Sequence, residues 1–335
     1  MMNVRRRRVL GLLIGLGISI LALVLTLRWA GLRSLKEALL RVDVRFLSVA
    51  VLVYLISMVW RAACWRILLG EKQSIWRVLA ALNQGYLLNN ILPWRMGELG
   101  RAILLGRRPD MSVQGVLSSI VVERLYDITI ALTLFVVLFP IAVGVSGVFR
   151  SAIMGATILT MAILALWLVL QRPLWVVKVL NRLPGGMGRW EHHWNRFREG
   201  LQALRNPRVF IVSFLWLVGS WFFAGLLYWF AIRSLVLNAE LLWAFFMLTV
   251  TMLGVAVPSS PGFIGVFEAS GVLALSVFDV PGDQALAATL VLHAIIYLIS
   301  SGLGAIAMIG EGETLTGLYR DLRSWVSMAS VQQAG

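Results

Sequence analysis

Two arginines and a glutamate lie within seven positions of a strongly hydrophobic chain, in a segment that proline and glycine interrupt. Arg95, Glu98 and Arg101 follow Pro93 and surround Gly97. Guanidinium groups form paired, charge-assisted hydrogen bonds with phosphate oxygens, so this segment has the chemistry to hold a phosphate. A charge at the centre of a bilayer costs about 2.5–3.5 kcal/mol on insertion scales. We therefore expect these side chains to face protein or a water-filled cavity.

A second interrupted segment lies far downstream and ends in one acidic residue. The sequence PSSPGFIGVFE starts at Pro258 and reaches Glu268. Hydrophobic segments that are broken by Pro and Gly in corresponding halves of a chain mark the substrate site of transporters built from inverted repeats. We therefore predict that residues 78–108 and 256–278 are re-entrant segments that enter from opposite faces of the membrane.

A third group of charges lies between the two broken segments. Glu123 and Asp127 are four positions apart, so they share one face of a helix, and Arg124 lies on an adjacent face. They belong to the cytoplasmic half of a long helix and can reach the first re-entrant segment. Two alternatives stay open: this group is a solvated helix end, or the charges of the first segment are ion pairs that only lock the fold.

The candidate site combines these charges with small polar residues of the second break. The predicted substrate-binding residues are Arg95, Glu98, Arg101, Glu123, Arg124, Asp127, Ser259, Ser260, Gly262 and Glu268. The predicted structural breaks are Asn90, Pro93, Gly97, Pro258, Pro261 and Gly265. The acidic residues would neutralise the arginines, take a cationic head group or carry a coupling proton.

Other polar residues of the apolar segments are given ordinary structural roles. Asn89 and Asn90 are expected to cap a broken helix, and Arg61 is expected to snorkel to the membrane surface. His293 is expected to satisfy its hydrogen bonds inside the membrane. No metal and no cofactor are expected, because the histidines lack HExxH spacing and the single cysteine, Cys64, forms no CxxC motif.

Composition places the chain among polytopic α-helical membrane proteins. Its 335 residues are 59% hydrophobic and 14% charged, far from the balance of a soluble domain. The net charge of +14 is explained by the positive-inside tendency and anionic lipid, so no nucleic acid partner is expected. We predict one membrane domain, residues 1–335, in the inner (plasma) membrane with both termini cytoplasmic.

The helical membrane core is predicted over residues 8–310, with about seven spanning helices besides the two re-entrant segments. Each apolar run is long enough to be a candidate for crossing the bilayer. The predicted spans are 9–27, 46–69, 114–143, 152–170, 209–232, 241–257 and 285–309. An amphipathic connection is predicted at 28–45, a cytoplasmic amphipathic loop at 172–208 and a cytoplasmic tail at 311–335.

Three motifs occur in order along the chain: Pro93-x-Arg95-x-Gly97-Glu98-x-x-Arg101, Glu123-Arg124-x-x-Asp127 and Pro258-x-x-Pro261-Gly262-x-x-Gly265-x-x-Glu268. Together they resemble the flippase-like membrane domain of the lysylphosphatidylglycerol synthase family. The resemblance implies a domain that moves lipids between leaflets, such as aminoacylated phosphatidylglycerol or, in stand-alone members, a glycolipid or polyprenyl-phosphate-linked lipid. The soluble synthase domain of the two-domain members is not found in this sequence, so we expect no enzyme activity.

The leading hypothesis is a flippase or scramblase-like transporter that passes a phospholipid or lipid-linked glycan head group through a central polar cavity. One alternative is an ion-coupled carrier of a small anionic solute, which the same residues would serve. Another is a membrane enzyme acting on lipid-linked sugars. The last is a non-catalytic scaffold for a partner enzyme that modifies lipids.

Overall fold

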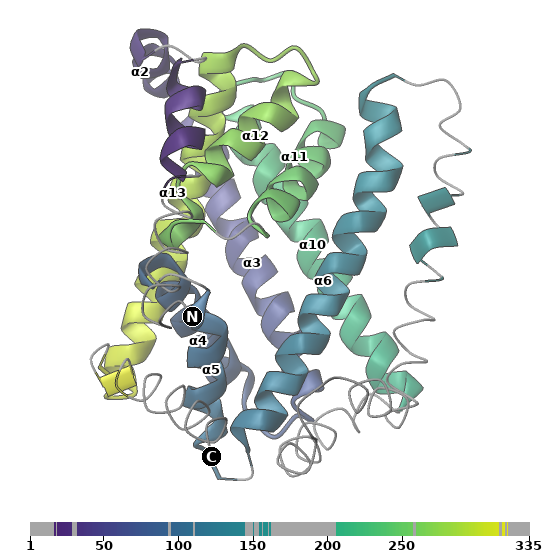
Figure 1. Ribbon diagram of the computed structural model, residues 1–335, viewed down its shortest axis with the longest axis vertical. Helices are drawn as coiled ribbons and strands as arrows, with labels where there is room; N and C mark the ends of the chain where they lie inside the picture. The colour runs from purple at the N-terminus through teal and green to yellow at the C-terminus, as the bar shows by residue number, and fades with distance from the viewer. Residues whose placement is uncertain are drawn as a thin grey trace, which may run out of the picture.

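The structure, a computed structural model, describes residues 19–28, 32–92, 95–109, 111–144, 206–256 and 259–314, with Gly17 and a few positions at 150–161 and 317–320. Every regular element in these ranges is a helix (Figure 1). Within the described ranges, four helices are long and apolar enough to cross a membrane: α3 (Val44–Leu68), α6 (Val113–Ala142), α10 (Pro207–Arg233) and α13 (Gly282–Gly310). They coincide with four predicted spans and confirm an all-α, multi-pass membrane protein.

Four shorter helices form two antiparallel pairs in opposite halves of the molecule along its long axis (Figure 1). The first pair is α4 (Ile75–Ile91) with α5 (Met96–Gly106), and the second is α11 (Leu241–Gly254) with α12 (Val266–Ser276). The two members of each pair pack against each other. Each pair is therefore one chain segment in which a helix ends, the chain reverses direction and a second helix packs against the first.

The predicted span 241–257 is wrong. α11 ends at Gly254 after 14 residues, which is a length of about 21 Å at 1.5 Å per residue. The hydrocarbon core of a bilayer is about 30 Å thick. The helix is instead the first arm of the second pair, and α12, the second arm, lies within the predicted segment 256–278.

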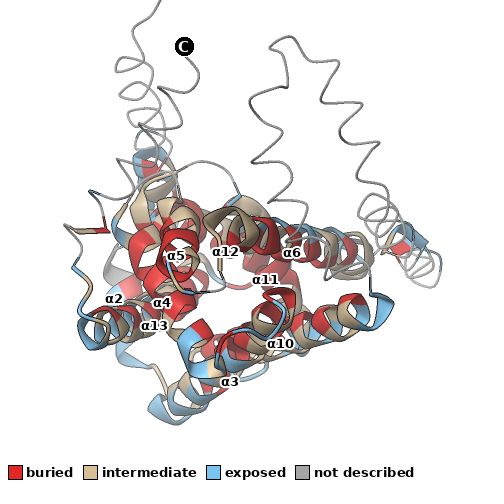
Figure 2. Ribbon diagram, turned by 90° about the horizontal axis from the view of Figure 1, so that it is seen from below, coloured by how far each residue is buried: buried red, intermediate tan, exposed pale blue. Residues whose placement is uncertain are grey.

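The described helices follow one order twice. A long helix, a short pair and a second long helix form the first unit, α3 to α6, and the same order forms the second unit, α10 to α13. α3 and α10 make the most extensive helix contact in the described structure, and Figure 2 shows them side by side. Each short pair also packs on the last helix of the other unit, α4 on α13 and α11 on α6.

The contact between α3 and α10 is reciprocal at its centre. Ser57 Oγ donates to the backbone oxygen of Ser220 at 2.9 Å, and Ser220 Oγ donates to the backbone oxygen of Ser57 at 3.1 Å. Each serine is buried and is the fourteenth residue of its helix. Contacts in which residue i meets j and j meets i are typical of a twofold-symmetric interface.

The break of the first pair lies between α4 and α5, and Pro93 lies outside the described residues. Arg95 precedes α5 in the left-handed region, with φ of 51°. Gly97 lets the two helices approach closely, because a Cβ at this position would lie 1.9 Å from the backbone oxygen of Gly85. The side-chain oxygen of Asn89 accepts from Gly97 N at 2.8 Å and so caps α5, as predicted.

The other predicted asparagine, Asn90, does not cap a broken helix. It lies inside the last turn of α4, and its side-chain amide donates to Ser301 Oγ on α13 at 2.8 Å. An amide inside a helix has no free helix end within reach, so it bonds to the neighbouring helix instead. Asn90 therefore joins the first pair to the second unit.

The break of the second pair follows the glycines and Pro261. Pro261 opens the 3-10 turn η3 (Pro261–Phe263), and Gly262 and Gly265 have φ values of 67° and 89°. Residues with a side chain rarely adopt these backbone angles, which explains why glycine occupies both positions. Of the predicted breaks, Pro261 and Gly265 lie in the interruption between α11 and α12, and Pro258 lies outside the described residues.

Several predicted segments fall wholly or mostly outside the described residues. They are the predicted spans 9–27 and 152–170, the loop 172–208 and the tail 311–335. Of the first, the structure describes a short apolar helix at Ser19–Arg28. The predicted connection 28–45 contains α2 (Leu32–Leu40), which packs on α13.

Candidate functional site

A fully buried glutamate joins three of the long and short helices. Glu123 on α6 has a side chain that is 0% exposed, and each of its carboxylate oxygens accepts from a different arginine. Oε1 accepts from Arg61 Nη1 of α3 at 2.7 Å, and Oε2 accepts from Arg101 Nη2 of α5 at 2.9 Å. The carboxylate is therefore compensated on both sides.

One turn further along α6, Asp127 extends these contacts to α10. Its carboxylate accepts from Arg61 at 2.9 and 3.0 Å, from Arg124 at 3.0 Å and from Trp221 Nε1 of α10 at 2.9 Å. Arg124 Nε also lies 3.0 Å from Glu98 of α5. We call the six charged residues the ion-pair network: Arg61, Glu98, Arg101, Glu123, Arg124 and Asp127.

The ion-pair network confirms that the charges of α6 reach the first broken segment. Its three arginines and three carboxylates balance, as burial of charge requires. The snorkelling role expected for Arg61 is wrong, since this side chain bonds to both Glu123 and Asp127 inside the bundle. The sequence signal for it was an arginine in the middle of an apolar run, a position that usually marks function or buried pairing.

Arg101 uses only part of its hydrogen-bonding capacity. Its side chain is 3% exposed, and its guanidinium lies 4.5 Å from the ring centroid of Trp65. Besides the bond from Nη2 to Glu123, its Nε and Nη1 are buried with no hydrogen-bond partner in the described part of the chain. A guanidinium has five N–H donors, so Arg101 has donors to spare.

Arg95 stands outside the ion-pair network. Its Nη2 donates to the backbone oxygen of Val255, just after α11, and its guanidinium lies 5.1 Å from the ring centroid of Phe263. Among the described residues no carboxylate forms a salt bridge with it. Arg95 is therefore a cation whose described acceptor is a neutral carbonyl, and it joins the break of the first pair to the break of the second.

Gly262 makes a second contact between the same two breaks. A Cβ built on it would lie 2.8 Å from the ring of Tyr297 and 3.6 Å from the backbone oxygen of Asn90. α4 also packs on the turn η3. We call this junction of Arg95, Val255, Phe263, Gly262 and Asn90 the tip contact. It lies near the middle of the long axis, where the facing ends of the two pairs approach (Figure 1).

The two predicted serines of the second break have different surroundings. Ser260 bonds through its backbone N to Ser19 Oγ at 2.9 Å and through its Oγ to the backbone oxygen of Ile264 at 3.0 Å. Ser259 Oγ is buried and has no hydrogen-bond partner among the described residues. Only Ser259 thus keeps an unused hydroxyl.

Glu268 forms a separate group with His293. Its side chain is 3% exposed, and Oε2 accepts from Gly265 N at 2.6 Å, which caps the start of α12. Oε1 lies 2.6 Å from Nδ1 of His293 on α13, so the expected hydrogen bond of His293 inside the membrane is confirmed. No hydrogen bond or ion pair within the described ranges joins Glu268 to the ion-pair network.

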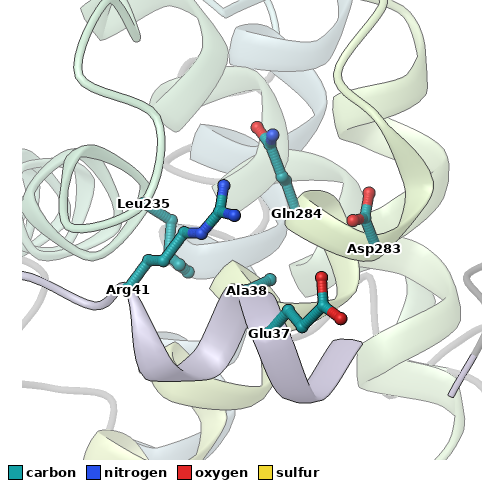
Figure 3. A pocket seen from close by; sticks show the side chains of 6 residues that line it. All are labelled: Glu37, Ala38, Arg41, Leu235, Asp283 and Gln284. Carbon is teal, nitrogen blue, oxygen red and sulfur yellow. The ribbon is translucent and has the colours of Figure 1, made fainter. Parts of the chain in front are cut away.

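A small pocket of about 110 Å³ lies apart from these groups, where α2 meets the start of α13 (Figure 3). It is lined by Glu37, Ala38, Arg41, Leu235, Asp283 and Gln284. None of these is a predicted site residue. In the described part of the chain, no three His, Cys, Asp or Glu side chains are grouped so that they could hold a metal ion.

Comparison with known proteins identifies the family. The family described as Lysylphosphatidylglycerol synthase TM region matches residues 12–304. The chain belongs to this family. The lysylphosphatidylglycerol synthase TM region thus includes the ion-pair network, the tip contact and the Glu268–His293 pair, and the resemblance of the three motifs is confirmed.

Several archaeal proteins are similar to the chain. The UPF0104 membrane protein MJ1595 of Methanocaldococcus jannaschii is 22% identical over 311 residues, which cover 87% of this chain and 92% of that protein. The UPF0104 membrane protein MJ1078 of the same organism is 24% identical over 225 residues, 65% of this chain and 92% of that protein. The UPF0104 membrane protein PH1989 of Pyrococcus horikoshii is 25% identical over 161 residues, which cover 46% of this chain and 48% of that protein. No solved structure matches the chain.

Proposed function

We propose that this protein moves a lipid between the two leaflets and holds a phosphate-bearing head group at the tip contact. The observation that carries the proposal is Arg95. It is a cation without a carboxylate partner among the described residues, at the point where the breaks of both pairs meet. The ion-pair network is neutral within itself, so Arg95 gives this region a net positive charge.

A phosphate would compete with the backbone oxygen of Val255 for the guanidinium of Arg95. The guanidinium donates to a neutral backbone oxygen of Val255, whereas hydrogen bonds to an ionised oxygen are about twice as strong as neutral ones. Binding of a phosphate therefore favours release of Val255 and separation of the two pairs. Ser259 Oγ supplies a further unused donor near the second break.

The repeated order of helices supports alternating access. A lipid keeps its tails in hydrocarbon, so the protein has to shield only the head group in a central polar cavity. We propose that the two units are inverted repeats, because their order is the same, their pairs lie at opposite ends and Ser57 and Ser220 bond reciprocally. Both pairs are then re-entrant segments, one entering from each face, and both termini are cytoplasmic.

The family also fits a phospholipid ligand, since it is named after a synthase of lysylphosphatidylglycerol. The proposed activity needs no covalent step, so we propose a transporter and not an enzyme. The substrate class is an anionic or aminoacylated phospholipid or a polyprenyl-phosphate-linked lipid, all of which carry phosphate.

The test is leaflet exchange of head-group-labelled lipids in vesicles that contain the purified protein. Arg95→Gln keeps a long polar side chain but removes the charge. Losing hydrogen bonds to a charged group costs about 2 kcal/mol, so we expect the exchange rate to fall roughly thirtyfold. Phosphatidylglycerol and a polyprenyl-phosphate lipid should be compared, because the better substrate identifies the class.

Arg66→Ala is the matched control. Arg66 is a half-exposed arginine that donates to the backbone oxygen of Gln73 outside the tip contact, so its removal should leave exchange unchanged. Equal rates for wild type and Arg95→Gln would contradict the role of the tip contact. Wild-type protein that is folded and exchanges no lipid would instead favour a carrier of a soluble anion or a scaffold for a partner enzyme.

A further inference from the structure

The two units carry an equivalent acid–base pair. Glu98 is the third residue of α5, and Glu268 is the third residue of α12. Glu98 pairs with Arg124, which is the twelfth residue of α6. Glu268 pairs with His293, which is the twelfth residue of α13. Each unit therefore links the start of its second short helix to the same position of its last long helix.

The basic members of the two pairs differ in one chemical property. The guanidinium of Arg124 keeps its charge at all physiological pH values. The second unit has an imidazole at this position, a side-chain type that as a class can exist with or without a proton at physiological pH. The pair of the first unit is thus permanently neutral in sum, whereas the pair of the second unit is neutral with a proton and carries one negative charge without it.

We propose that Glu268 and His293 form a proton-binding site that couples proton movement to lipid passage. This inference rests on the proposed function and adds its energy source. The Glu268 carboxylate that contacts His293 also accepts a hydrogen bond from Gly265 N, the N-cap residue of α12. Loss of the proton leaves an uncompensated buried charge at that position, which is costly. The proton therefore decides how firmly the start of α12 is held.

Within the described residues, the side-chain hydrogen bonds of the pair join Glu268 to His293 and Gly265 N to Glu268. α11 carries no ionisable side chain, and the Tyr297 ring centroid is 6.2 Å from that of His293. The other titratable or charged residues whose side chains are described, on the elements packed around the pair, are Arg28, Lys36, Glu37, Arg41, Arg77, Tyr86, Arg95, Arg208, Tyr228, Arg233, Asp283 and Glu311. In the described structure none of these forms a hydrogen bond or salt bridge with Glu268 or His293. Among the described residues, no second ionisable side chain bonds directly to the pair.

The experiment measures the steady-state distribution of a labelled lipid between leaflets under a pH gradient. It uses the full chain in vesicles of phosphatidylglycerol and phosphatidylcholine, with the membrane potential held at zero. If one proton moves with each lipid, a gradient of about one pH unit should produce a roughly tenfold difference between leaflets. Without coupling, the label reaches equal amounts on both sides.

His293→Arg copies the fixed cation of the first unit and should abolish the gradient-driven difference, as should Glu268→Gln. The matched control replaces the other two histidines, His192 and His193, with glutamine and should keep the tenfold difference. If the wild-type protein exchanged lipid but the gradient did not change the distribution between leaflets, proton coupling would be contradicted and the proposed lipid transport would not. Retention of the difference in His293→Arg would also contradict proton coupling. Absence of exchange with any lipid would overturn both proposals.

Discussion

Replacement of Glu123 by alanine is expected to lower the free energy of unfolding by about 3–5 kcal/mol, because breaking a buried ion pair leaves an uncompensated buried charge. Here two arginines are affected, since Arg61 and Arg101 each donate to a different oxygen of this carboxylate. The measurement is thermal or denaturant unfolding of the purified protein in detergent. Glu123→Gln keeps the shape and should recover only a small part of the loss.

Glu71→Ala is the control for this substitution. Glu71 is 61% exposed and lies 3.9 Å from Arg66, and exposed pairs of this kind contribute at most about 1 kcal/mol. If Glu123→Ala unfolded no more easily than Glu71→Ala, the ion-pair network would not hold the first pair against α3 and α6. The charges of α6 would then be free to serve the substrate alone.

Gly97→Ala is expected to separate α5 from α4 and to abolish lipid exchange. The added methyl would lie 1.9 Å from the backbone oxygen of Gly85 and 2.7 Å from Asn89 Oδ1. The backbone of α4 cannot change rotamer as a long side chain can, so the added methyl group has to increase the distance between the two helices. Overpacking of this kind costs about 1–3 kcal/mol. Because Arg95 lies two residues earlier, the tip contact is displaced as well. Thermal unfolding and the exchange rate measure the two effects.

Gly302→Ala provides the matched comparison on α13. A Cβ at this position meets no atom within 4 Å, and alanine is favoured over glycine inside a helix by about 0.5–1 kcal/mol. We expect unchanged or slightly raised stability and normal exchange. A Gly97 variant that behaved like the Gly302 variant would show that the close approach of α4 and α5 is not required.

Hydropathy located the long helices because each is a continuous apolar run bounded by polar residues. It failed at α11, where the apolar run continues through Gly254 and Ala256 and conceals the end of the helix. Pro and Gly identified both breaks, since positive φ at Gly262 and Gly265 is a local property of the backbone. The local sequence pattern did not indicate that the chain reverses after α11 and that α12 packs against it.

The site was predictable where its charges are close in sequence and was missed where the partners are distant. Glu98, Arg101 and the charges of α6 stand near breaks or one turn apart, and the structure joins them. Arg61 lies 62 and 66 positions from Glu123 and Asp127. Pairing over that separation depends on which faces of α3 and α6 meet, and a single sequence does not specify this.

The reciprocal bonds of Ser57 and Ser220 have a consequence for energetics. When two units share one fold and a symmetric seam, any arrangement in which they differ has a counterpart with their roles exchanged. If the two units are inverted repeats, as proposed above, the packing across α3 and α10 would be the same in both arrangements, and their free energies would be nearly equal. Their populations are then set by the few residues that differ between the units, and a bias of about 1.4 kcal/mol shifts the ratio tenfold.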